Sequence, residues 1–104
     1  MVNSSYDVSL WTACSRGVDS EVSEILKKDV EIEERGGVHG STPLLAAVEN
    51  GNLSVVEMLI EAKADCSARD GRGMCPLHIA VCGGFLDIAE KLLMNGCDVN
   101  ARIE

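Results

Sequence analysis

The stretches Thr-Pro-Leu-Leu-Ala-Ala (residues 42–47) and Cys-Pro-Leu-His-Ile-Ala (residues 75–80) lie 33 residues apart and indicate an internal repeat. The match extends on both sides without a gap, from residues 40–69 to residues 73–102. A weaker copy lies upstream at an offset of 34, which places Leu10, Ala13 and Gly17 on Leu44, Ala47 and Gly51. A fixed period of this length predicts a repeat architecture, in which each unit buries its apolar face against its neighbours.

Each unit predicts two short helices separated by a glycine. Thr42 is a helix N-cap, and Pro43 takes the first helical position, where its missing N–H has no cost. This helix runs to about Asn50 and ends at Gly51, which can take a positive φ. The second helix of each unit carries one apolar stripe. The stripe residues are Val18, Val22, Ile25 and Leu26, then Leu53, Val56, Leu59 and Ile60, then Leu86, Ala89, Leu92 and Leu93.

These motifs resemble those of the ankyrin repeat family. Residues 42–47 and 75–80 are similar to its signature Thr-Pro-Leu-His-x-Ala, and residues 64–68 and 97–101 to its loop-closing segment Ala-Asp-Val-Asn-Ala. The resemblance implies an all-α ankyrin-repeat solenoid of about three helix-turn-helix units with short turn or β-hairpin fingers. We expect a single domain over residues 1–104, with approximate units at 6–36, 37–69 and 70–102. The family also implies protein–protein recognition without catalysis.

The signature is incomplete in every unit. In the family its threonine hydroxyl and its histidine imidazole bond to each other and to the local backbone. The second unit has Thr42 but Leu45, and the third has His78 but Cys75. The first unit lacks the signature, as expected for a solvent-facing capping repeat. We expect Trp11 in the core of its first helix, with an exposed binding contact as the alternative.

Composition narrows the partner class. Of the 104 residues 46% are apolar, which excludes a disordered chain, and the net charge of −8 disfavours nucleic acid and anionic membranes. No apolar run reaches the about 20 residues that span a bilayer, and the N-terminus does not resemble a secretory signal. The five cysteines form no CxxC pair. We therefore expect reduced thiols, an intracellular (cytoplasmic or nuclear) location and no cofactor.

The leading interpretation is an ankyrin-repeat adaptor or inhibitor that binds a protein partner through its concave helix and finger surface. A small regulator of few repeats is an alternative of the same class. The variable positions of the family imply these contact residues: Val38, His39, Ser41, Glu49, Asn50, Gly71, Arg72, Met74, Cys82 and Gly83.

Arginines recur in phase along the fingers. Arg35, Arg69 and Arg102 occupy equivalent positions at the bases of successive fingers, and Arg72 lies within one of them. Because a guanidinium binds carboxylates in two-point fashion, this row predicts contact with an acidic segment of the partner. The alternative is that these arginines pair with neighbouring acids such as Asp70 or Glu34.

A different class of function rests on Cys75, His78 and Cys82, which fall at i, i+3 and i+7 of one helix. They suggest a metal-binding or thiol-reactive protein, although metal sites usually show tighter paired spacing. The leading interpretation expects no metal.

Two expectations concern the C-terminal end. Asn100 follows Asp98 and Val99, with Leu92 eight residues upstream. This matches the pattern that asparaginyl hydroxylases favour in ankyrin repeats, so the resemblance implies a possible hydroxylation site. The third unit also keeps interior-type apolar residues on both helices. We therefore expect further repeats or self-association at this end.

Overall fold

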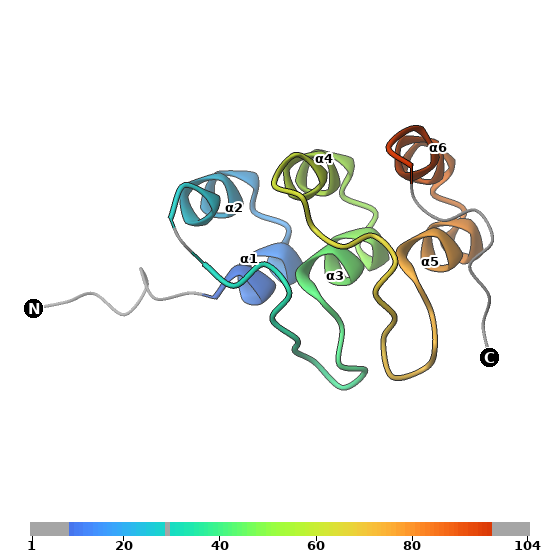
Figure 1. Ribbon diagram of the computed structural model, residues 1–104, viewed down its shortest axis with the longest axis horizontal. Helices are drawn as coiled ribbons and strands as arrows, with labels where there is room; N and C mark the ends of the chain where they lie inside the picture. The colour runs from blue at the N-terminus through green and yellow to red at the C-terminus, as the bar shows by residue number, and fades with distance from the viewer. Residues whose placement is uncertain (1–8, 29, 97–104) are drawn as a thin grey trace, which may run out of the picture.

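The computed structural model describes residues 9–28 and 30–96. This part of the chain contains no strand, and its helices are α1 (Leu10–Arg16), α2 (Asp19–Leu26), α3 (Pro43–Glu49), α4 (Leu53–Glu61), α5 (Pro76–Gly83) and α6 (Leu86–Met94). They form successive antiparallel pairs. Figure 1 shows an inner layer of α1, α3 and α5, an outer layer of α2, α4 and α6, and long finger loops on the side of the inner layer. This is the expected all-α solenoid. None of the helices in the described ranges is both long and apolar enough to cross a membrane.

The helix boundaries follow the predicted signals. The Thr42 hydroxyl accepts a hydrogen bond from the backbone N–H of Leu45 at 3.3 Å, and Pro43 begins α3. The helix ends at Glu49, one residue before the predicted end. Gly51 follows with a φ of 68°, a left-handed conformation that favours glycine.

The third pair begins without a side-chain cap. Cys75 precedes α5 and makes no capping hydrogen bond to its first turn. Its buried Sγ lies 3.3 Å from Nδ1 of His78 instead. The two signature groups of this unit therefore do meet, although a thiol replaces the usual hydroxyl.

The apolar core runs through the stack between the two layers. Fully buried members include Leu44, Leu45, Val48, Val55, Val56, Leu59, Ile88 and Leu92. The predicted stripes are confirmed at their central positions. Leu86 and Leu93 are the exceptions, because they are 72% and 43% exposed on the last described pair, where no further pair covers them within the described residues.

Trp11 is half-buried and packs beneath the first finger, which corrects its expected place in the core. A Cβ added at Gly36 would lie 2.6 Å from the indole ring, and one at Gly37 would lie 2.8 Å from it. Gly36 and Ser41 form an isolated antiparallel bridge at the base of this finger. The two glycines thus let the finger backbone lie directly on the ring.

The cysteines are not all reduced. Cys14, Cys75 and Cys82 are free thiols, but Cys66 is disulfide-bonded, so the expectation of five reduced cysteines is wrong at this residue. Burial raises the pKa of Cys14 to about 12, which keeps this thiol protonated and unreactive at neutral pH.

Candidate functional site

A hollow of about 290 Å³ opens between α3, α5 and the second finger. Its lining residues are Glu49, Arg72, Met74, Ile79, Cys82, Gly83 and Phe85. All except Ile79 and Phe85 belong to the contact set that the sequence predicts. The structure therefore brings a large part of that set, drawn from two helices and a finger, to one place.

The floor of the hollow is apolar because two glycines let an aromatic ring lie across the backbone. A Cβ added at either Gly51 or Gly83 would lie 2.6 Å from a ring carbon of Phe85. Ile79, which is 6% exposed, lines the hollow as well. Sequence reasoning missed both floor residues, although Gly83 and Gly84, which directly precede Phe85, were a usable signal.

The rim carries a charged network centred on Arg72. Its Nη2 donates to Oδ2 of Asp70 at 2.7 Å and to Oε2 of Glu49 at 2.8 Å, and its Nε donates to the same Asp70 oxygen at 3.0 Å. The hydrogen bond to Asp70, followed by that to Glu49, raises the pKa of Arg72 above its usual value. The guanidinium thus links the second finger to the end of α3.

Asp70 anchors this finger turn. Its side chain is fully buried, and its Oδ1 accepts the backbone N–H groups of Arg72 at 2.8 Å and Met74 at 3.1 Å. Burial alone would raise the pKa of Asp70, but the hydrogen bonds from Arg72 and Met74 outweigh it and hold the pKa below its usual value. The carboxylate therefore stays ionised and fixes the rim.

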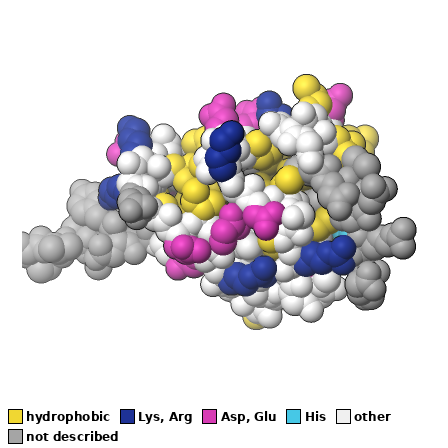
Figure 2. Space-filling model, in the orientation of Figure 1, with side chains coloured by type: hydrophobic (Ala, Val, Ile, Leu, Met, Phe, Trp, Pro, Cys, Tyr) yellow, Lys and Arg dark blue, Asp and Glu magenta, His cyan; other side chains and the backbone are white. Residues whose placement is uncertain are grey.

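Arg35 joins adjacent fingers. Its Nη1 donates to the carbonyl oxygen of Gly40 at 2.7 Å and to that of Arg69 at 2.6 Å. The backbone N–H of Gly71 also donates to the carbonyl of His39, at 2.6 Å. Figure 2 shows basic side chains on the finger side of the molecule, below a group of acidic ones. Arg35 therefore positions fingers through backbone carbonyls, which neither interpretation of the arginine row anticipated.

Some of the remaining predicted contact residues are exposed, and others make contacts within the fold. Val38 is 94% exposed on the first finger. Ser41, in contrast, is buried at the base of that finger, so it is corrected from a surface contact to a structural residue. Asn50 caps α1, because its Nδ2 donates to the carbonyl oxygen of Ser15 at 2.6 Å. Asn100 and Arg102 lie outside the described residues.

The proposed cluster of Cys75, His78 and Cys82 does not form a metal site. Within residues 9–28 and 30–96, no group of three or more His, Cys, Asp or Glu side chains is arranged to hold a metal ion. Cys82 lies on the hollow, whereas buried Cys75 contacts His78 at the start of α5. The spacing along one helix was not sufficient, since ligands must also converge on a common point.

Comparison with known proteins agrees with this architecture. A family model described as ankyrin repeats (3 copies) matches residues 10–103. The chain is 44% identical over 62 residues to protein phosphatase 1 regulatory subunit 27 of Homo sapiens, which covers 60% of this chain and 40% of that protein. It is 46% identical over 63 residues to the ARF GTPase-activating protein Git of Drosophila melanogaster, covering 61% and 9%.

A third relative matches more of the chain. The B-cell lymphoma 3 protein homolog of Mus musculus is 30% identical over 90 residues, covering 86% of this chain and 20% of that protein. The chain thus spans less than half the length of each of these curated relatives. Its repeat period, its paired helices and the match over residues 10–103 together show that the chain belongs to the ankyrin repeat family.

Proposed function

We propose that this chain binds a protein partner through the hollow and the adjoining fingers, inside the cell, as an adaptor or inhibitor and not as a catalyst. The observation that carries the proposal is the meeting of Glu49, Arg72, Met74, Cys82 and Gly83 around one apolar-floored hollow. At about 290 Å³ the hollow lies just below the usual range for small-molecule pockets. It suits a single anchoring side chain of a partner.

The arginines of the second finger indicate which groups of the partner would lie beside the anchoring side chain. The carbonyl oxygen of Arg69 accepts a hydrogen bond from Arg35, but the Arg69 guanidinium makes no hydrogen bond or ion pair in the described part of the chain, so it is available to an acidic segment. Arg72 is already shared between Asp70 and Glu49, so a partner carboxylate would have to displace Glu49. We therefore propose an apolar side chain in the hollow and an acidic group beside Arg69.

Affinity capture from cell extract with matched variants tests this function. Met74→Glu and Cys82→Glu place a carboxylate in the hollow. Met94→Glu makes the same chemical change on α6, where the side chain is 75% exposed and lies outside the lining. We expect the parent and Met94→Glu to capture the same partner proteins. Met74→Glu and Cys82→Glu should no longer capture them. If the hollow variants capture the same proteins in the same amounts, the concave site is wrong.

A further inference from the structure

A second groove runs along the outer layer between α2 and α4. One section, of about 530 Å³, is lined by residues that include Asp19, Ser54 and Met58, and a second section of about 270 Å³ continues it toward Leu26. The two sections share Ser23, Met58 and Glu61. The groove therefore extends along the whole of α4, whose nine residues measure about 14 Å at ~1.5 Å per residue.

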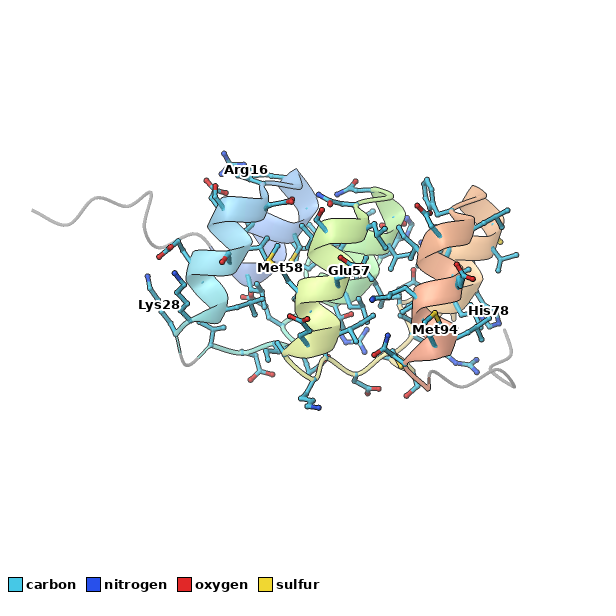
Figure 3. All side chains as sticks on the ribbon, turned by 90° about the horizontal axis from the view of Figure 1, so that it is seen from above. Arg16, Lys28, Glu57, Met58, His78 and Met94 are labelled. Carbon is cyan, nitrogen blue, oxygen red and sulfur yellow. The ribbon has the colours of Figure 1, made fainter. Side chains whose placement is uncertain are left out.

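The groove between α2 and α4 differs from the next junction in the stack, between α4 and α6, which an ion pair bridges. Lys91 stands 33 residues after Met58, at the equivalent repeat position. Its Nζ reaches back to the preceding outer helix and pairs with Oε2 of Glu57 at 3.4 Å. Met58 cannot make such a bridge to α2, and no ion pair joins α2 to α4 among the described residues. Figure 3 shows Met58 between α2 and α4, with Glu57 nearer to α6.

The groove combines an apolar floor with acidic ends. Met58 and Leu26 supply polarisable and aliphatic surface, and methionine is well suited to adaptable binding surfaces. Asp19 lies at one end, and among the described residues its carboxylate is engaged only by a 3.4 Å hydrogen bond from the Asn52 side chain. Glu61 lies toward the other end, and its carboxylate has no hydrogen bond or ion pair in the described part of the chain. Lys27 is the basic residue of the lining, and its Nζ is paired with Glu24.

We propose that this groove is a second binding surface, which accepts a basic amphipathic helix of a partner protein. A helix laid between two helices fits the packing of side-chain ridges into grooves. Its apolar side chain would contact Met58, and Arg or Lys residues one turn before and after would reach Asp19 and Glu61. The net charge of −8 would draw such a segment toward the chain. The groove lies on α2 and α4, so it is independent of the hollow on α3 and α5.

The probe is a labelled helical peptide of about 15 residues, with a central Leu and Arg one turn away on each side of it. A control peptide carries Glu in place of both Arg residues. Binding is followed by fluorescence anisotropy. Glu61→Lys reverses a charge in the groove, and Glu90→Lys makes the same reversal on the exposed surface of α6. Met58→Lys introduces the residue found at the equivalent position of the next repeat.

We expect the basic peptide to bind the parent and the acidic peptide not to bind. Glu61→Lys and Met58→Lys should each weaken binding by about tenfold, whereas Glu90→Lys and Met74→Glu should change it by less than about twofold. Circular dichroism checks folding, and if Met58→Lys does not fold, Glu61→Lys decides the test. Equal losses in Glu61→Lys and Glu90→Lys would overturn the proposal, because they would indicate general charge attraction alone. Failure of the basic peptide to bind the parent, or loss of binding in Met74→Glu, would overturn it as well.

Discussion

At the scale of single residues, Asp70 is the side chain on which the rim of the hollow depends most. Its carboxylate is buried and holds both the turn and Arg72, and its pKa lies below the ordinary value of 3.8. A carboxyl whose pKa is lower in the folded state stabilises the fold above its unfolded pKa. It loses that contribution as the pH falls through the folded pKa.

Replacing Asp70→Asn should therefore destabilise the protein in a pH-dependent way. We expect a loss of about 1–3 kcal/mol at neutral pH, because charge-assisted hydrogen bonds to a buried group are removed. The difference from the parent should be constant above about pH 5 and should shrink as the pH falls below 3.8. Urea unfolding across this pH range measures it. A difference that does not change with pH would show that ionisation of Asp70 is unimportant.

The N-cap of α5 offers a stabilising substitution. Cys75 makes no capping hydrogen bond, whereas Thr42 at the equivalent position accepts one from Leu45. We expect Cys75→Thr to raise the free energy of unfolding by about 0.5–1 kcal/mol, since a hydroxyl accepts from the helix N–H groups and from His78 better than a thiol does. Unchanged or lower stability in urea unfolding would contradict this.

Arg69 and Arg72 should respond differently to charge reversal. With a partner in hand, Arg69→Glu should slow association and reduce its dependence on salt, with a stability change of about 0.5 kcal/mol or less. Arg72→Glu should also destabilise the fold, because it places a carboxylate beside buried Asp70 and beside Glu49. Association rates at several ionic strengths, with urea unfolding of each variant, separate the two effects. If the association rate changes neither with salt concentration nor in the Arg69→Glu variant, the partner does not contact Arg69 through an acidic segment.

At the scale of elements, the glycines that end the inner helices have equivalent backbones and different surroundings. Gly51 after α3 and Gly84 after α5 have φ values of 68° and 75°. A Cβ at Gly51 would lie 2.6 Å from the ring of Phe85, whereas a Cβ at Gly84 would meet nothing within 4 Å. Substitutions at Gly51 and Gly84 therefore separate two contributions to stability, the strain of a left-handed backbone and the crowding of an added Cβ.

We expect Gly84→Ala to destabilise by about 1–2 kcal/mol, which is the cost of a left-handed conformation for a residue with a Cβ. Gly51→Ala should cost about 1–3 kcal/mol more, because the ring of Phe85 must shift. It should also disturb partner binding at the hollow, which Gly84→Ala should leave intact. Thermal or urea unfolding of the two variants gives the comparison. Equal losses of unfolding free energy in the two variants would mean that the Phe85 ring shifts at no energetic cost.

At the scale of the whole molecule, the end of the stack at α5 and α6 is apolar. Val48 on α3 is fully buried, but Val81, its equivalent on α5, is 59% exposed. Leu86 and Leu93 on α6 are 72% and 43% exposed. Leu53 and Ile60 on α4, which are equivalent to Leu86 and Leu93, are half-buried. Within the described residues, this face has the surface of an internal interface with no neighbour on it.

We therefore expect a further repeat or a second copy of the chain to cover this face. Sedimentation of the isolated chain should show association that grows with concentration, together with binding of apolar dyes. The double substitution Leu86→Glu and Leu93→Glu should abolish both while the helical content is retained. Strictly monomeric behaviour of the parent at high concentration, without dye binding, would count against an interface here.

The repeat and its helices could be predicted from the amino-acid sequence alone. The period of 33 residues, the caps at Thr42 and Pro43 and the helix stop at Gly51 are local signals, and the structure follows them. The variable positions of the repeat also pointed to most of the rim of the hollow. These features were predictable because each depends on neighbours along the chain or on an exact repeat of spacing.

The contacts between side chains of different repeats could not be predicted from the sequence and are seen only in the folded chain. The fold placed Phe85 against Gly51, turned Asn50 toward α1 and bound Arg35 to the carbonyl of Arg69 in the next finger. It also left the groove at Met58 open where Lys91 bridges the next junction. Such contacts depend on distances between residues about one repeat apart in the chain. A periodic pattern specifies that repeats stack, but it does not specify which side chains fill each junction.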